Sequence, residues 1–132
     1  MEEIIIWTNG CFDVLHRGHI ELFKYAKSLG GKLYVGIDSD KKVRLDKGNS
    51  RPINNVEDRK FTLESIKYIE EVIIFNTTED LEELILLIQP DIMIIGSDWK
   101  GKTVVGEQHA QHVRFFDRIE GYSTTDILEW KN

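Results

Sequence analysis

Two histidines, His16 and His19, are the residues of this chain whose types and spacing most clearly favour chemistry. Side chains three residues apart lie on one side of a helical turn. Two imidazoles there can donate hydrogen bonds to phosphate oxygens and stabilise the charge that develops when an α-phosphorus is attacked. Gly18, between them, lets the backbone approach a ligand closely. The spacing alone leaves capping, surface polarity and metal binding open as other roles.

The flanking segments predict how this pair is positioned. Residues 4–7 form a short apolar run that Asn9 and Gly10 break, which is typical of a buried parallel strand. Apolar residues then recur at helical spacing over residues 18–29. A helix that starts there offers unpaired N–H groups and a partial positive charge, so the strand–turn–helix unit predicts a phosphate site.

The rest of the chain alternates between strand and helix patterns. Further strands are expected at 33–37, 72–75, 92–95 and 113–116, further helices at 56–68, 81–88 and 124–130, and a polar irregular stretch at 38–54. This alternation predicts an α/β fold, a Rossmann-like doubly wound sheet of about five parallel strands with helices on both faces. We expect one domain over residues 1–132, with its ligands beyond the carboxyl ends of the strands. The long stretches 38–54 and 97–111 follow those ends.

Composition narrows the classes of partner. The 132 residues carry a net charge of −6, which does not favour the broad basic face of a nucleic-acid-binding protein. The single cysteine excludes an internal disulfide and a cysteine metal cluster, and it fits a cytoplasmic location. No apolar run approaches the roughly 18 residues of a membrane span, and the N-terminus lacks a secretory pattern.

The segment from Thr8 to His19 resembles the signature of the cytidylyltransferase-like nucleotidyltransferases, which is H-x-G-H after G-x-F-D. The resemblance covers almost the whole chain. It implies an enzyme that joins the nucleotidyl group of a nucleoside triphosphate to a small phosphorylated acceptor and releases pyrophosphate. It also implies a Mg²⁺ ion with the triphosphate, and a homodimer. A nucleotide-binding sensor module is the non-enzyme alternative. The absence of G-x-G-x-x-G after the first strand argues against a dinucleotide-dependent dehydrogenase.

Two branches of this family are mixed in the sequence. Residues 63–68, 98–102 and 118–125 resemble the cytidylyltransferases that act on glycerol 3-phosphate, whereas residues 8–13, 47–52 and 104–106 resemble the adenylyltransferases that act on heptose 1-phosphate. The choice of base depends on the walls around residues 96–102 and before Ser123, and both segments resemble the cytidylyltransferases more than the adenylyltransferases. We therefore expect CTP and a polyol phosphate such as glycerol 3-phosphate. ATP and a sugar (heptose) 1-phosphate are the alternative.

The resemblance also implies roles for individual residues. The catalytic group comprises His16, His19, Lys47 and Arg118. The nucleotide-binding group comprises Thr8, Gly10, Cys11, Phe12, Gly18, Asp98, Ser123, Thr124 and Thr125. The acceptor-binding group comprises Asp13, Lys47 and Arg59, and no residue is expected to be a metal ligand.

Each role has a simpler alternative. Ser123 can cap the last helix while its neighbours bind phosphate, and the two roles can coexist. Arg118 could instead form a surface ion pair with Asp117 or Glu120, and Lys47 is expected in a polar loop where a charge is often only solvated. Asp13 is interpreted as structural or as an organiser of magnesium. Cys11 is interpreted as a packing residue, and His109 and His112 as surface residues.

Overall fold

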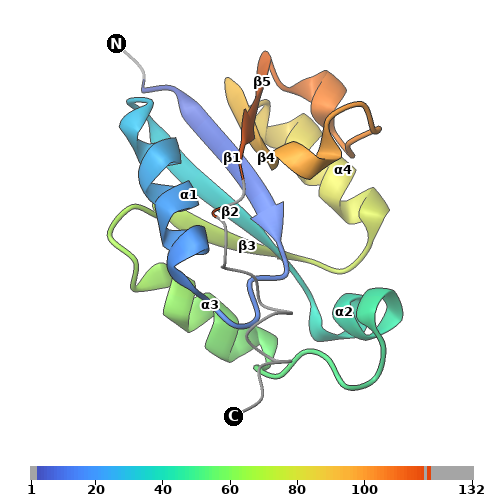
Figure 1. Cartoon of the computed structure of the whole chain (residues 1–132). Coiled ribbons are helices and arrows are strands. Elements are labelled where there is room, and N and C mark those ends of the chain that lie inside the picture. The colour runs from blue at the N-terminus through green and yellow to red at the C-terminus, as the bar shows by residue number, and fades with distance from the viewer. Residues whose placement is uncertain (1–2, 118, 120–132) are drawn as a thin grey trace.

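The computed structural model describes residues 3–117 and 119 of the chain. They form a sheet of five parallel strands in the order β3-β2-β1-β4-β5 (Figure 1). The strands are β1 (Ile5–Gly10), β2 (Lys32–Asp38), β3 (Glu71–Phe75), β4 (Ile92–Gly96) and β5 (His112–Phe116). The predicted Rossmann-like doubly wound sheet is confirmed.

Helices cover both faces of the sheet, as expected (Figure 1). The α-helices are α1 (Arg17–Ser28), α2 (Asp40–Lys47), α3 (Val56–Glu64) and α4 (Thr78–Ile88), with 3₁₀ turns η1 (Ser97–Trp99) and η2 (Glu107–His109). Consecutive strand residues point to opposite faces, so Ile6 packs with α1 and α3 while Trp7 packs with α4. The strand order changes direction between β1 and β4, where such sheets bind ligands.

The indole of Trp7 depends on a glycine in the neighbouring strand. Trp7 is fully buried. A Cβ atom on Gly36 of β2 would lie 2.5 Å from the Trp7 ring, so glycine provides the room for the indole. The Trp7 Nε1–H donates to Asn9 Oδ1 at 2.9 Å, which satisfies the one polar atom of the ring. Trp7 thus fixes the orientation of the last residues of β1.

The helix α2 lies where we expected an irregular stretch, so that part of the prediction is wrong. Its sequence is almost entirely polar and only Val43 is buried, so it lacks the apolar stripe that marks a helix. A local signal was present, because the Ser39 side chain caps the helix by accepting from Lys42 N–H at 3.2 Å. Lys47 is therefore the last residue of a helix rather than a loop residue.

Two smaller differences concern helix ends. The helix α3 ends at Glu64 instead of residue 68. The helix α4 begins at Thr78 instead of residue 81, and the Thr77 side chain caps it.

Among the helices of the described residues, 3–117 and 119, none has the length and apolar character of a membrane-spanning segment.

Candidate active site

The histidine pair forms the start of α1. His16 is the N-cap residue, and its Nδ1 accepts a hydrogen bond from Gly18 N–H at 3.0 Å. His19 returns the interaction, since its Nδ1 accepts from His16 N–H at 3.2 Å. The two rings are stacked with centroids 3.9 Å apart. The predicted proximity of the two imidazoles is confirmed, and a reciprocal capping box produces it.

This capping fixes the chemistry that the rings can offer. An Nδ1 that accepts a hydrogen bond carries no proton, so each ring in its neutral form carries its proton on Nε2. Burial, with added repulsion from His16 and Lys47, lowers the pKa of His19 from 6.5 to about 4. His19 is therefore a neutral hydrogen-bond donor at neutral pH.

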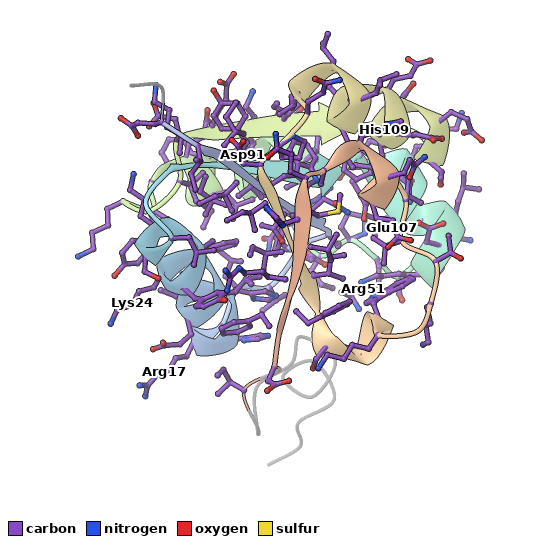
Figure 2. The ribbon with its side chains drawn as sticks, turned by 90° about the horizontal axis from the view of Figure 1, so that it is seen from above. Arg17, Lys24, Arg51, Asp91, Glu107 and His109 are labelled. Atoms are coloured by element: carbon purple, nitrogen blue, oxygen red, sulfur yellow. The ribbon has the colours of Figure 1, made fainter. Side chains whose placement is uncertain are left out.

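The same contacts engage the N–H groups at the start of α1, which we expected to bind phosphate. The Gly18 N–H is engaged by His16, and the N–H groups of His19 and Ile20 both donate to the His16 carbonyl, at 3.1 and 3.3 Å. Backbone groups that we expected to be available for phosphate are thus used by the cap. Arg17, between the histidines, points to solvent and pairs with Glu21 (Figure 2).

Phe12 connects the histidine pair to the end of β1. Its backbone has a φ of 50°, a left-handed conformation that is uncommon for an aromatic residue. Its ring makes an edge contact with His19 at 5.4 Å between centroids and packs on Phe23. A Cβ atom on Gly10 would lie 3.2 Å from the Phe12 ring, so glycine suits the strand end over which the ring lies. The turn therefore supports His19 through the Phe12 ring.

A cavity of about 520 Å³ opens at the carboxyl ends of β1, β2 and β4. Five of the predicted residues line it: Thr8, Gly10, Cys11, Phe12 and Lys47. One wall is apolar and the other carries charge. The apolar wall includes Leu22, Leu81, Ile94, Ile95, Trp99, Val104 and Val105, and the charged wall comprises Asp38, Lys42, Asp46 and Lys47.

Thr8 and Cys11 have clear structural roles within this cavity. The buried Thr8 hydroxyl donates to the Ile94 carbonyl at 3.0 Å and so joins β1 to β4. Cys11 is buried, and burial raises the pKa of its thiol. A thiol held in its neutral form is a poor nucleophile, which agrees with the interpretation of Cys11 as a packing residue.

Arg59, predicted to bind the acceptor, is buried and bonded within the protein. It is 2% exposed. Its guanidinium donates to the carbonyls of Cys11, Asp38 and Asn54 at 2.9, 2.8 and 3.0 Å, and to Asp40 Oδ1 at 2.8 Å. The sequence offered no charge partner one turn along its own helix, whereas the partner in the structure lies on α2. Arg59 thus joins the ends of β1 and β2 to the start of α2.

Asp13 is also engaged in the protein. Its carboxylate accepts from Ile53 N–H at 2.7 Å, from Asn54 N–H at 2.8 Å and from Arg51 Nε at 3.2 Å. Burial alone would raise the pKa of Asp13, but these donors outweigh it and hold the pKa below its ordinary value. Both carboxylate oxygens accept hydrogen bonds, so Asp13 anchors the segment before α3, as the structural one of its two interpretations expects.

Other predicted residues lie apart from the cavity or outside the described chain. Asp98 is exposed in η1 and is not part of the cavity lining, although Gly96 and Trp99 on either side of it are. Arg118, Ser123, Thr124 and Thr125 fall outside the described residues. His109 lies over α4, with its Nε2 3.6 Å from Glu82 Oε1 (Figure 2), and His112 is exposed at the start of β5.

Sequence reasoning did not single out Asp38, Lys42 or Asp46. All three line the cavity. Their spacing of four residues at the end of a strand could have predicted that the three side chains lie together. That prediction requires α2 to be recognised as a helix first. No group of three or more histidine, cysteine, aspartate or glutamate side chains suited to a metal ion occurs in the described part of the chain.

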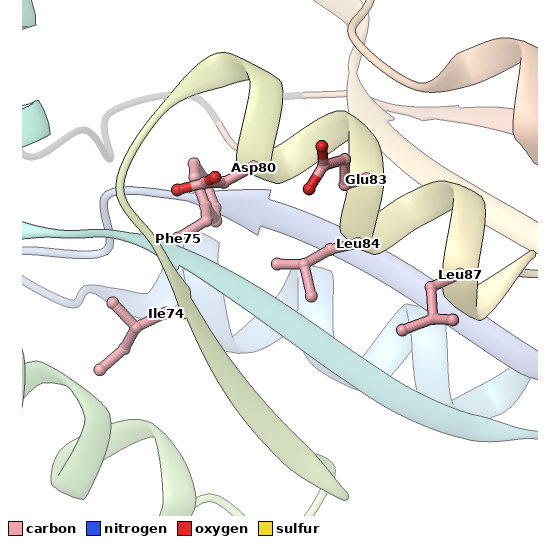
Figure 3. Close-up of a pocket in the computed structure, with 6 residues that line it drawn as sticks. All are labelled: Ile74, Phe75, Asp80, Glu83, Leu84 and Leu87. Atoms are coloured by element: carbon pink, nitrogen blue, oxygen red, sulfur yellow. The ribbon is translucent and has the colours of Figure 1, made fainter.

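A second hollow lies between the edge strand β3 and α4 (Figure 3). It is lined by Ile74, Phe75, Asp80, Glu83, Leu84 and Leu87. Its charged residues are two carboxylates, with no basic group among the lining residues, so it is unsuited to a triphosphate. The cavity at the ends of β1, β2 and β4 is therefore the candidate active site. His16 and His19 are not among its lining residues, but Phe12, whose ring contacts His19, is.

Comparison with known proteins agrees with this geometry. The family model described as cytidylyltransferase-like matches residues 7–129. The bifunctional protein HldE of a Nitratiruptor species is 48% identical over 95% of this chain, and that of Campylobacter concisus is 43% identical over 95%. The chain spans only about a quarter of the length of these curated relatives, 27% and 26% respectively.

A solved structure also resembles this chain. A lipopolysaccharide core biosynthesis protein from Thermoplasma volcanium superimposes with a TM-score of 0.69 at 26% sequence identity, covering 89% of this chain and 99% of that one. The family match includes the histidine turn, the strands that form the cavity and the apolar wall. On this evidence, the chain belongs to the cytidylyltransferase-like family of nucleotidyltransferases.

Proposed function

We propose that this chain is an adenylyltransferase that transfers the adenylyl group of ATP to a sugar (heptose) 1-phosphate. An oxygen of the acceptor phosphate attacks the α-phosphorus and forms a new P–O–P bond. The bond from the α-phosphorus to the oxygen that bridges to the β-phosphorus breaks, and pyrophosphate leaves with the electron pair. The acceptor supplies the nucleophile, so the enzyme contributes position and electrostatic stabilisation.

The observation that carries this reaction type is the stacked histidine pair. Its Nδ1 atoms are bound to the backbone, so the rings present Nε2–H donors in a fixed arrangement. Such donors stabilise the charge that develops on the α-phosphate oxygens during attack, and their fixed positions avoid reorganisation in the transition state. A neutral His19 suits this role because it donates without transferring its proton.

Lys47 adds a positive charge close to the histidines. It ends α2, lines the cavity and is near enough to lower the pKa of His19. Its ammonium is suited to bind the α-phosphate or the acceptor phosphate between α1 and α2. A Mg²⁺ ion would be held mainly by oxygens of the triphosphate and would supply further positive charge there.

Two kinds of similarity support ATP and a sugar phosphate over CTP and glycerol 3-phosphate. The HldE relatives, at 48% and 43% identity over most of this chain, favour the adenylyltransferase branch that residues 8–13 and 47–52 resemble. The Thermoplasma protein is described as acting in lipopolysaccharide core biosynthesis, and such cores are built from sugars. Our expectation of CTP, based on residues 98–102 and 118–125, becomes the second candidate.

The test is a substrate panel. The purified protein is incubated with Mg²⁺, each of the four nucleoside triphosphates and a series of sugar, polyol and glycerol phosphates, and pyrophosphate release is measured. The proposal expects release with ATP and a sugar 1-phosphate. Release only with CTP and glycerol 3-phosphate supports the second candidate, and no release with any pair supports the sensor module.

A further inference from the structure

One wall of the cavity carries three linked charges that the proposed chemistry does not use. Lys42 Nζ lies 2.7 Å from Asp46 Oδ2 and 3.5 Å from Asp38 Oδ1. We name these residues, Asp38, Lys42 and Asp46, the charge triad. The Lys42 ammonium also lies 5.8 Å from the centroid of the Phe75 ring. The triad is thus a fixed group at the end of β2 and along α2.

Helix stability is a weak explanation for this arrangement. Exposed ion pairs spaced four residues apart contribute only about 0.3–0.5 kcal/mol. The side chains of Lys42 and Asp38 are 16% and 15% exposed, so both charges are largely withdrawn from water, which has a cost that pairing only partly offsets. All three residues face the cavity that contains Cys11 and Lys47. Their position therefore matters for what enters the cavity.

The donors and acceptors of the charge triad suit hydroxyl groups. Lys42 donates a hydrogen bond to one oxygen of Asp46 and forms an ion pair with one oxygen of Asp38. A carboxylate has about four lone-pair positions and an ammonium has three donors, so each group keeps positions for further hydrogen bonds. The remaining positions can bind neutral hydroxyls in both directions. Two carboxylates around one ammonium would repel a further phosphate.

The place of the charge triad also separates it from the phosphate-binding groups. The histidine pair begins α1, and Lys47, which ends α2, is close enough to lower the pKa of His19. Lys42 lies more than one helical turn earlier in α2, against Phe75 of β3. An acceptor whose phosphate lies between the histidines and Lys47 would extend its remaining atoms along α2 toward the charge triad.

We propose that the charge triad is the specificity determinant for the acceptor, and that it binds the hydroxyl groups of a polyhydroxylated sugar phosphate. This inference rests on the proposed function, because it names the part of the same cavity that selects the acceptor. Lys42 is its centre, because its ammonium holds both carboxylates in place.

Steady-state kinetics with ATP test the inference on wild type, Lys42→Met and Asp46→Asn. The acceptors are heptose 1-phosphate and its singly deoxygenated analogues. Loss of hydrogen bonds to hydroxyls should raise the acceptor KM about tenfold and reduce discrimination against the deoxy analogues to about the same extent. The KM for ATP should stay within about twofold of wild type, because the triad lies apart from the groups proposed to bind phosphate. Lys41→Met, on an exposed neighbour in the same helix, is the matched control and should match wild type.

Calorimetry separates this inference from the proposed function. Binding of heptose 1-phosphate and of glycerol 3-phosphate is measured on wild type, Lys42→Met and Asp46→Asn. If wild type makes product only from CTP and glycerol 3-phosphate, the proposed function fails and the sugar phosphate is excluded as the ligand of the charge triad. Weaker binding of glycerol 3-phosphate to Lys42→Met would then support only the position of the charge triad in the acceptor site. If wild type uses heptose 1-phosphate while both variants keep its affinity and the discrimination against deoxy analogues, the inference is overturned and the proposed function stands.

Discussion

The Nδ1 atom of His19 accepts a hydrogen bond from the backbone N–H of His16 at 3.2 Å, while the two rings stack at 3.9 Å. This contact makes both histidines part of the cap of α1, and His19 also contacts the ring of Phe12, which lines the cavity of the candidate active site. Together with the bond from Gly18 N–H to His16, it gives both neutral rings the same tautomer, with the proton on Nε2. The observed role as a helix cap and the proposed catalytic role therefore fall on the same two residues, and variants must separate them.

His16→Asn should retain the helix cap and lose the imidazole donor. An asparagine side chain caps a helix well, so the melting temperature should change little, while kcat should fall about 10²–10³-fold because one transition-state donor is lost. His16→Ala should lose both, with a cap contribution of about 1 kcal/mol. Turnover and thermal melting are measured on both variants, with Arg17→Ala as the exposed control. Near-normal turnover of His16→Asn would remove this residue from catalysis.

The stability of the protein should depend on pH through His19. Its pKa is about 4 in the folded protein and 6.5 in the unfolded chain, so the unfolded state binds more protons between these values. The contribution of His19 to stability is fully present above pH 6.5 and is lost as the pH falls from 6.5 to about 4. Urea unfolding across this range should show the loss in wild type and a smaller one in His19→Asn.

Asp13 titrates at lower pH than His19, so its effect on stability can be measured separately in the same experiment. The folded pKa of Asp13 lies below its ordinary value of 3.8, so its contribution is present above pH 3.8 and is lost as the pH falls through its folded pKa. Asp13→Asn should flatten the curve below pH 3.8 only. Identical curves for wild type and His19→Asn between pH 4 and 6.5 would contradict the assigned environment of His19.

Cys11→Ser should keep most of the turnover. The thiol is buried and its pKa is raised, and the proposed nucleophile is the acceptor phosphate. Alkylation by iodoacetamide at about pH 7 should accordingly be slow. A nucleotidyl–enzyme intermediate detected by mass spectrometry, or a folded but inactive Cys11→Ser, would contradict direct transfer.

Arg59→Met should destabilise the fold strongly. Removing one partner of a buried ion pair typically costs about 3–5 kcal/mol, because the remaining charge is left without compensation. Here the carbonyls of Cys11, Asp38 and Asn54 lose their donors as well. Arg44→Met, an exposed residue of α2, is the control. A stable Arg59→Met that binds ATP normally but has lost acceptor affinity would contradict a purely structural role and support the predicted role in acceptor binding.

The strands and helices were predictable wherever buried positions recur at a regular spacing and are occupied by apolar residues. The strands around Ile6 and Ile94 and the helix α1 have clear apolar patterns, and the structure contains them near the expected positions. The histidine pair was predictable because its spacing is local. The helix α2 was missed because nearly all its residues are polar, and the contacts of Arg59 and Asp13 were missed because their partners lie 19 and 41 residues away in the sequence.

One measurement tests the proposed reaction most directly. Equal concentrations of ATP and CTP are mixed with Mg²⁺ and the protein, with heptose 1-phosphate and glycerol 3-phosphate both in excess, and the nucleoside-diphosphate products are separated by chromatography and identified by mass. We expect an ADP-heptose product in clear excess, with release of one pyrophosphate for each molecule formed. A clear excess of CDP-glycerol would contradict the adenylyltransferase assignment, and the absence of any nucleotidyl product would contradict the transferase activity itself.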